Sequence, residues 1–499
     1  MGGDGRNSSG MTSATTRTGT VIVGSGFAGL CMAIRLREAG ISDFVILERA
    51  NDVGGTWRDN DYPGCACDIP SVLYSFSFAP KSDWSRVYPT QPEIQAYLAD
   101  CVRRFRLERH LRFGCDVVEA RYDEAEARWH VRTASGETYV ARAFVSAMGG
   151  LSNPYEPDIA GRETFAGPSF HSARWNHAVS LEGRDVAVIG TGASAIQFVP
   201  ELAPRVRSLT VYQRTAPWIV PKLDGELGPR ERALRRYLPL YGWLRRKLVY
   251  WLLEIRAIGF TVNPKLLAKN EGIALRHLER QIADPELRKA VWPDGRMGCK
   301  RVLISNDYYP ALARPNVEVV TDAIARIEPD GIVTADGTKR RADAIVYGTG
   351  FRAQEAVGRA RVIGAGGRTL ADAWRDGMEA FLGVSVAGFP NMYLLIGPNT
   401  GLGHSSMVYM IESQTNYVLS AMRYVRERKA AALDIRPEVQ RAFNEELQHR
   451  MKRTVWNSGC RSWYLDVNGR NTTLWPGFTF EFRRKTYRIA PRRYRVLHH

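Results

Sequence analysis

The 499-residue sequence has no run of about 18 apolar residues, so it predicts no membrane-spanning helix. Its seven cysteines are scattered and lack a Cys-x-x-Cys spacing, which argues against a zinc site or a redox pair. We therefore expect buried or idle thiols and no metal. Residues 1–18 lack the apolar core of a signal peptide and are expected to form a disordered leader, which favours a cytoplasmic protein.

Acidic residues are outnumbered, with 52 aspartates and glutamates against 69 lysines and arginines, a formal net charge of +17. The basic residues are spread out and form no nucleic-acid motif, so we expect them to attract anionic dinucleotides rather than nucleic acid. The exception is 232–260, where basic and large apolar residues alternate. This composition suits a helix in peripheral contact with a membrane, but packing of a helical insertion on its own domain is favoured.

The first of two glycine-rich fingerprints contains Gly24, Gly26 and Gly29. It follows the apolar run 21–23 and opens a helical stretch, and Glu48 ends the next apolar run, 19 residues after the last glycine. Such glycines permit a tight turn and let the backbone approach a pyrophosphate at a helix N-terminus. A carboxylate at the position of Glu48 accepts hydrogen bonds from ribose hydroxyls and repels a 2′-phosphate. The first unit therefore suits FAD.

The second fingerprint contains Gly190, Gly192 and Ala195 and follows the apolar run 185–189. Arg214 stands 19 residues after Ala195, again beyond a second apolar run. A guanidinium at this place binds a 2′-phosphate through paired, charge-assisted hydrogen bonds. The second unit therefore suits NADPH.

Two segments, 143–150 and 343–350, are short apolar strands that run into glycines, and they bracket the second fingerprint. This arrangement predicts an α/β fold with two Rossmann-like dinucleotide-binding domains, the second inserted in the first, so that nicotinamide and flavin could meet between them. The predicted parts are an FAD-binding domain (19–150 and 343–499, with a C-terminal loop) and an NADPH-binding domain (151–342) that carries a helical insertion at about 228–295.

The segment 165–176 lies between the fingerprints and reads Phe-x-Gly-x-x-x-His-x-x-x-Trp, with His171, Trp175 and then Asn176. It resembles the signature of Baeyer–Villiger monooxygenases, which are class B flavin-dependent monooxygenases, except that Asn176 replaces Pro or Asp. The related N- and S-oxidising flavin monooxygenases carry Tyr-Lys in place of Trp-Asn, so the Baeyer–Villiger type is the nearer match. The resemblance extends over roughly residues 19–480.

The resemblance implies FAD and NADPH as cofactors. It assigns His171 and Trp175 to the coupling of NADPH binding with catalysis rather than to proton transfer, and a hydrogen-bonded core histidine is the alternative for His171. If their segment were helical, both would lie on one face. Lys300 would be a second cation beside Arg214 at the 2′-phosphate. Besides the fingerprint residues, the implied cofactor contacts are Gly55, Thr56, Trp57, Asp68, Val118, Lys300 and Trp463.

The implied reaction converts a ketone to an ester or lactone, with NADPH and O₂, through a flavin C4a-peroxide. Attack on the ketone carbonyl requires the anionic peroxide, and a guanidinium can hold an anion without titrating. The resemblance assigns this role to Arg301, with Asp68 as its orienting partner. An ordinary structural ion pair is the alternative for Arg301.

Two other functions stay open. The same scaffold can form S- or N-oxides, and a catalytically silent flavoprotein could serve as a binding module, although Glu48, Arg214 and Arg301 argue against silence. Cys65 and Cys67 suggest a disulfide reductase, but those enzymes have a longer spacing between their redox cysteines. The sequence does not identify the ketone, and the apolar insertion suggests only that it is lipophilic.

Overall fold

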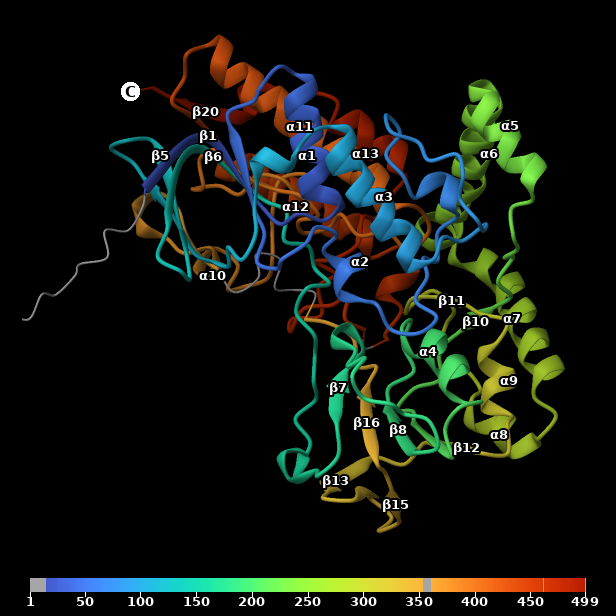
Figure 1. The fold of residues 1–499 in the computed structure, drawn as a ribbon. Coiled ribbons are helices and arrows are strands. Elements are labelled where there is room, and N and C mark those ends of the chain that lie inside the picture. The colour runs from blue at the N-terminus through green and yellow to red at the C-terminus, as the bar shows by residue number, and fades with distance from the viewer. Residues whose placement is uncertain (1–14, 353–359, 461, 499) are drawn as a thin grey trace, which may run out of the picture.

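The computed structural model describes residues 15–352, 360–460 and 462–498. They form two α/β units, one above the other in Figure 1, with a group of helices along one side. Each unit contains a sheet with parallel strands, and one glycine fingerprint follows a strand of each sheet. The predicted α/β fold with two Rossmann-like units is confirmed.

The upper unit in Figure 1 is built on an eight-stranded sheet. Its strands are β1 (Thr15–Val23), β2 (Phe44–Leu47), β3 (Leu111–Arg112), β4 (Val117–Asp123), β5 (Arg128–Thr133), β6 (Thr138–Ser146), β17 (Arg361–Ile363) and β18 (Met392–Leu394). The order is β17-β4-β5-β6-β1-β2-β3, with β18 paired to β6. Strands β6, β1 and β2 are parallel and largely buried, as expected for a central layer covered on both faces.

Strand β1 begins at Thr15, within the stretch predicted as a disordered leader. Residues 15–18 pair in register with 138–141 of β6. Threonine suits a half-exposed strand because its branched side chain packs well on a pleated surface. The leader prediction was therefore wrong for residues 15–18, and the rest of it, 1–14, lies outside the described residues.

Helices from both ends of the chain cover the upper sheet. They are α1 (Phe27–Glu38), α2 (Thr56–Asp59), α3 (Gln91–Arg104), α10 (Leu370–Ala373), α11 (Met407–Glu427), α12 (Pro437–Met451) and α13 (Thr479–Lys485). Helix α1 lies between the sheet and α11, and it is apolar almost all round because both sides are covered. Strands β19 (Ala432–Ile435) and β20 (Tyr494–Leu497) form a separate two-stranded antiparallel sheet in this unit.

The lower unit contains a five-stranded parallel sheet in the order β12-β9-β8-β16-β7. Its strands are β7 (Ser169–His171), β8 (Asp185–Ile189), β9 (Ser208–Tyr212), β12 (Val317–Val320) and β16 (Ala344–Tyr347), and its helices include α4 (Ala195–Leu202) and α9 (Tyr308–Leu312). A separate antiparallel sheet is formed by β13 (Ile324–Glu328), β14 (Gly331–Thr334) and β15 (Lys339–Arg341).

Strand β16 corrects the predicted domain boundary. Residues 343–350 were assigned to the returning FAD domain, whereas β16 pairs with β8 and β7 in the lower sheet. The two glycine-ended segments are equivalent strands of different sheets, because β6 lies beside β1 and β16 lies beside β8. The chain therefore leaves the lower sheet after Tyr347, and β17 is the next strand in the upper one.

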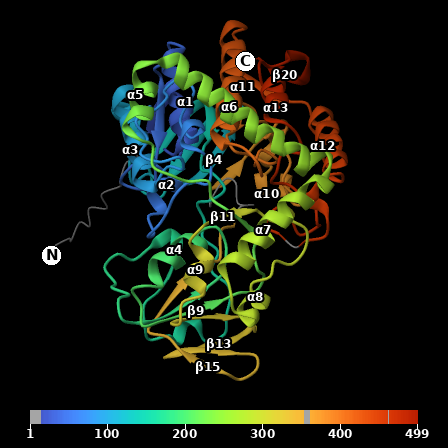
Figure 2. The same ribbon diagram turned by 90° about the vertical axis from the view of Figure 1, so that its right-hand side faces the viewer.

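In the chain, the helices along the side come between two short strands that pair with each other, β10 (Ile219–Val220) and β11 (Leu303–Ile304). They are α5 (Pro229–Tyr237), α6 (Pro239–Ala257), α7 (Ala268–Gln281) and α8 (Pro285–Ala290). Figures 1 and 2 show that they start from the lower unit and that α6 crosses the outside of the upper one. No helix in the described parts of the chain is long and apolar enough to cross a membrane.

Candidate cofactor-binding and active site

The glycines of the first fingerprint serve two purposes. Gly24 has a φ of +102°, and a β-carbon at Gly29 would collide with the Gly24 carbonyl oxygen, so the turn itself requires both residues. Gly26 is different, because a β-carbon there would meet nothing nearer than the Gly55 Cα at 3.6 Å. The backbones of Gly26 and Gly55 therefore lie close together with no side chain between them, and such a bare backbone lets the pyrophosphate of FAD approach.

Glu48 follows β2 and is 4% exposed. Its Oε2 accepts hydrogen bonds from the Ser25 amide at 2.9 Å and the Ser25 hydroxyl at 2.8 Å. Its Oε1 lies 3.0 Å from the Arg58 guanidinium. These contacts fix a carboxylate beside the fingerprint, where it suits ribose hydroxyls and disfavours a 2′-phosphate.

The segment that the resemblance assigns to flavin packs against the first fingerprint. The Gly54 amide donates to the Ser25 carbonyl at 3.1 Å, and Thr56 begins α2. The buried Trp57 donates from its Nε1 to the Tyr74 hydroxyl at 3.0 Å. Gly55 therefore lies against the first fingerprint, and Thr56 and Trp57 follow it directly in α2.

Val118 lies at a break in the ladder between β4 and β5. Val117 pairs with Thr133 and Glu119 pairs with Arg132, so Val118 is an extra residue in its strand. Such bulges re-aim side chains and are common beside functional sites. The contact of Val118 with a cofactor remains a prediction.

The second fingerprint repeats the first with one exchange. Gly190 has a φ of +108°, and a β-carbon at Gly192 would meet only the Gly348 carbonyl oxygen, at 3.7 Å. Ala195 takes the place of the third glycine. It is buried, and a β-carbon at Gly348 would lie 3.2 Å from the Ala195 Cβ. Gly348, which directly follows β16, therefore lets the helix and the strand approach closely. The open position of Gly192 leaves room for a second pyrophosphate.

Arg214 follows β9 and is exposed, and Lys300 reaches it from the segment after the inserted helices. Burial, and then the Arg214 charge, lower the pKa of Lys300. An anion beside both cations would relieve their repulsion. This pair therefore fits the 2′-phosphate of NADPH.

Arg301 and Asp68, 233 residues apart in the chain, form an ion pair between the two units. The Arg301 Nε donates to Asp68 Oδ2 at 2.9 Å, and an Nη of the same guanidinium bonds that oxygen as well. The carboxylate raises the pKa of Arg301 above its usual value, so the guanidinium stays charged. Their side chains are 33% and 30% exposed, so the ion pair is not fully enclosed.

Tyr464 adjoins this ion pair, a role that was not predicted for it. It is 1% exposed, and burial raises its pKa to about 12 against the influence of the Arg301 charge. Trp463, the predicted contact, is 46% exposed, and its ring centroid lies 4.5 Å from that of Tyr464. The structure thus buries the neighbour of the predicted residue, and the contact of Trp463 with a cofactor remains a prediction.

The signature segment is not a continuous helix, so the shared helix face considered for His171 and Trp175 does not exist. His171 ends β7, and a short 3-10 helix (Ser172–Arg174) follows. The His171 Nδ1 accepts a hydrogen bond from the Ala173 amide at 3.1 Å, and burial lowers the pKa of His171. The ring also contacts Phe351, where the chain leaves the lower unit. His171 therefore joins the two segments that connect the units.

Trp175 packs on Phe198 of α4 with ring centroids 5.5 Å apart, and Phe198 packs on Tyr62 of the upper unit at 5.9 Å. Asn176, the departure from the family signature, accepts a hydrogen bond from the Ala178 amide at 3.1 Å through its Oδ1. An aspartate can make the same bond, so the exchange preserves this turn.

Gln197 of α4 makes a second, unpredicted contact between the units. It accepts a hydrogen bond from the Tyr62 hydroxyl at 2.9 Å and donates to the Ala66 carbonyl at 3.0 Å. A glutamine inside a fingerprint helix carries no signal for such a role. It ties the flavin-side segment directly to the NADPH-side helix.

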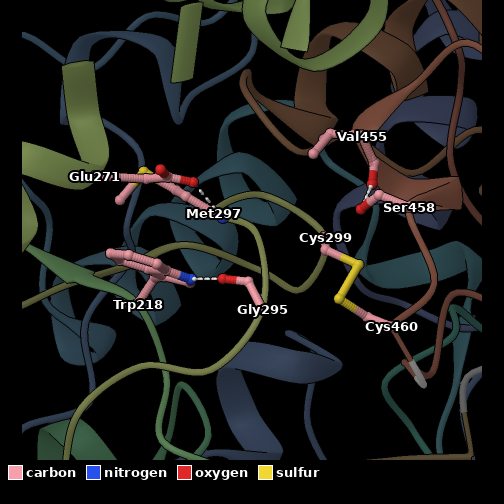
Figure 3. The surroundings of a disulfide bond; sticks show 8 residues. All are labelled: Trp218, Glu271, Gly295, Met297, Cys299, Val455, Ser458 and Cys460. Atoms are coloured by element: carbon pink, nitrogen blue, oxygen red, sulfur yellow. Dashed lines mark hydrogen bonds between the residues drawn. A yellow bond between two sulfur atoms is a disulfide. The ribbon is translucent and has the colours of Figure 1, made fainter. Parts of the chain in front are cut away.

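The cysteines differ from expectation at one pair. Cys65 and Cys67 are free and buried, and burial raises the pKa of Cys65 to about 12, which does not suit a redox pair. Cys299 and Cys460, expected to be idle thiols, form a disulfide (Figure 3). No local pattern indicates this bond, because 161 residues separate its ends.

Two glycine fingerprints whose neighbouring charges suit FAD and NADPH, with the Arg301–Asp68 ion pair between the units, fit the class of flavin-dependent monooxygenases. Residues 21–229 match the family model described as pyridine nucleotide-disulphide oxidoreductase. A Baeyer–Villiger monooxygenase of Streptomyces coelicolor is 52% identical over 95% of this chain and 92% of its own length, and one of Pseudomonas aeruginosa is 50% identical over 93% and 89%. A steroid monooxygenase structure bound to NADP superposes with a TM-score of 0.87 at 31% identity, over 97% of this chain and all of its own.

The chain belongs to the Baeyer–Villiger monooxygenase family. It is an FAD- and NADPH-dependent enzyme that oxidises a ketone to an ester or lactone.

Proposed function

We propose that Arg301 is the catalytic residue of this reaction and that Asp68 positions it. Bound FAD, once reduced by NADPH, supplies the activation of O₂. The observation that supports the proposal is the two-nitrogen contact of Arg301 with one oxygen of Asp68, which orients the guanidinium and leaves part of it free. A charge so preorganised stabilises negative charge that develops on oxygen during transfer to the ketone.

We further propose that Arg214 and Lys300 bind the 2′-phosphate of NADPH, and that Glu48 binds the ribose of FAD. His171 and Trp175 would couple the two sites, because their contacts join the crossing segments and both units. The remaining proposed contacts with the cofactors are Gly24, Gly26, Gly29, Gly55, Thr56, Trp57, Asp68, Val118, Gly190, Gly192, Ala195 and Trp463. The proposed domains follow the two sheets, with the helical insertion belonging to the NADPH-binding one.

The reaction is tested by NADPH consumption under O₂ with cyclic, linear, aryl and steroid-like ketones and with sulfides, the products being identified by mass. We expect at least one lipophilic ketone to give an ester or lactone that carries one additional oxygen atom. Products from sulfides or amines alone would instead favour S- or N-oxygenation on the same scaffold. Bound flavin without turnover on any compound would favour the silent binding module.

We also propose that the enzyme is cytoplasmic and contacts an anionic membrane surface through 232–260. Helix α6 is held to the upper unit by one face, where Tyr250 and Leu253 are buried and Arg246 donates to the Val72 carbonyl at 2.6 Å. The other face is left to solvent (Figure 2). Leu240, Leu244, Leu248, Trp251 and Ile255 are exposed and spaced three or four residues apart, so they form an apolar stripe along this face. The exposed Trp243 and Leu252 lie beside the stripe.

The charges around this stripe favour a lipid surface over a second copy of the chain. Residues 229–260 contain eight arginines and lysines and two glutamates. Glu254 is buried against Thr479, and Glu231 accepts hydrogen bonds from Arg235 and Tyr241. Both carboxylates therefore already have partners within the protein. Two such faces would repel each other, whereas anionic headgroups attract basic residues beside buried apolar side chains.

Replacing both Trp243 and Trp251 with glutamate should weaken binding to phosphatidylglycerol-containing vesicles at least about tenfold, because two large anchors are lost and two negative charges are added. Sedimentation with these vesicles and with pure phosphatidylcholine measures the effect. Wild type should bind the anionic vesicles less at high salt, and Phe113→Glu, exposed elsewhere, should bind as wild type does. Equal binding by the double variant, or no binding by wild type, would contradict the proposal.

A further inference from the structure

The Cys299–Cys460 disulfide joins two segments that both enter the proposed active site. Cys299 immediately precedes Lys300 and Arg301, and Cys460 lies four residues before Tyr464. The two cysteine Cα atoms are 6.0 Å apart. The bond therefore connects the segment of the two proposed site cations to the loop whose buried Tyr464 adjoins Arg301.

The Cys299 end is fixed. Figure 3 shows the Trp218 indole donating to the Gly295 carbonyl, at 3.1 Å, and the Met297 amide donating to Glu271, at 3.1 Å. Met297 is 1% exposed and Cys299 is fully buried. Contacts from the inserted helix α7 and from the residue before β10 thus hold this segment in place.

The Cys460 end belongs to a loop with little burial of its own. Between the buried Trp456 and Asn471, every described residue except Tyr464 is partly or fully exposed, and Val467 is 96% exposed. The far half of the loop is anchored where Arg470 pairs with Glu379 at 2.6 Å. At the near half, the disulfide is a covalent link to the fixed segment beside Arg301.

We propose that Cys299–Cys460 is a redox-sensitive tether that positions Tyr464 against the Arg301–Asp68 pair, and this inference rests on the proposed role of Arg301. With the disulfide formed, the loop covers the ion pair and limits the access of water. With it reduced, the half of the loop that carries Trp463 and Tyr464 can leave. Cys460 is thus a positioning residue, which acts through Tyr464.

The chemistry of the switch needs a dithiol and hydrogen peroxide. A dithiol reductant attacks the sulfur of Cys460, the partly exposed residue of the pair, so the disulfide breaks and Cys299 takes up a proton. The reductant's second thiol then releases Cys460 as the reductant closes to its own disulfide. In the reverse direction, two thiols and one H₂O₂ give the disulfide and two waters. Disulfides in reducing compartments are usually transient and redox-sensing, in keeping with the proposed cytoplasmic location.

The tether would respond to a side product of the enzyme's own reaction, hydrogen peroxide. An O₂-activating flavoenzyme releases H₂O₂ when its reducing equivalents fail to reach the substrate. The same H₂O₂ would close the tether and shield the ion pair, because excluding water from an active site suppresses such side reactions. The tether would therefore raise the yield of product per NADPH when H₂O₂ accumulates.

The test compares oxidised wild type, dithiol-reduced wild type and Cys460→Ser, each as holoenzyme, with Cys115→Ser as a matched control at a free cysteine in the upper unit. Thiol alkylation and mass spectrometry first count the free thiols. Hydrogen exchange of a peptide covering 457–465 then measures the release of the loop without substrate. Product formed per NADPH consumed measures its effect on the site.

We expect exchange in this peptide to be at least about tenfold faster after reduction or in Cys460→Ser, and product per NADPH to fall about twofold or more. A dithiol should have no further effect on Cys460→Ser, and Cys115→Ser should behave as wild type. A wild type with no disulfide after H₂O₂ treatment, unchanged exchange, or faster exchange with unchanged product yield would each overturn the proposal. Since exchange needs no turnover, failure of the tether is distinguishable from failure of the Arg301 assignment.

Discussion

Arg301→Ala should lower the rate of ester or lactone formation by about 10² to 10³, the usual cost of removing one preorganised group that stabilises developing negative charge. Flavin should stay bound and reducible by NADPH, because the guanidinium contacts Asp68 rather than either glycine fingerprint. Anaerobic stopped-flow reduction, followed by product analysis in air, separates the two steps.

Arg301→Lys is the matched control for charge. An ammonium keeps the charge but lacks the planar set of donors that reaches both Asp68 and an anion, so activity should not return. S-oxidation, which needs no anionic nucleophile, should fall less than ketone oxygenation in both variants. Undiminished ester formation in Arg301→Ala would refute the assignment.

Gly26→Val should abolish FAD binding, and Gly192→Val should spare bound FAD but remove its reduction by NADPH. Each glycine has room for a β-carbon, with the nearest atoms at 3.6 Å and 3.7 Å, so the substitutions obstruct the ligand more than the fold. A branched side chain would occupy the space where a pyrophosphate approaches the backbone. Flavin absorbance after purification and anaerobic reduction by NADPH measure the two effects.

The neighbouring glycines provide the contrast. A β-carbon at Gly29 or Gly190 would collide with a backbone carbonyl, so Gly29→Ala and Gly190→Ala should lower the yield of folded protein itself. Thermal unfolding and circular dichroism should show Gly26→Val and Gly192→Val folded. If Gly192→Val lost FAD as its sole defect, the order of the two sites would have to be exchanged.

The two nucleotide units could be predicted because their constraints are local. Gly24 and Gly190 need a positive φ, Glu48 and Arg214 follow their strands at a fixed spacing, and a short stretch of sequence contains all of this. Whether β16 belongs to the upper or the lower sheet is decided by its neighbour β8, and both candidate strands are apolar and end in glycine. The strand β16 could therefore be predicted from the sequence, but it was assigned to the wrong sheet.

The active site was predictable only where a motif reached it. Arg301 and Asp68 were paired through resemblance, since 233 residues lie between them. The family resemblance extended to the segment of Trp463 and Tyr464, but Trp463 was chosen as the contact because a buried tyrosine is commonly an ordinary core residue. Gln197 had no signal, because a glutamine is commonly on the surface. The Cys299–Cys460 bond depends on two loops meeting in space, which no local pattern records.

The contact between Ala195 and Gly348 shows that the two positions share room for one methyl group, since a β-carbon at Gly348 would lie 3.2 Å from the one at Ala195. Ala195 carries that methyl here, and a second one at Gly348 would crowd it. The third glycine of this fingerprint has in effect moved to the adjoining strand, 153 residues along the chain. A search that demands glycine at all three fingerprint positions would miss the second nucleotide unit. The physical requirement behind the third glycine, a helix and a strand that meet with a single methyl group between them, is still met.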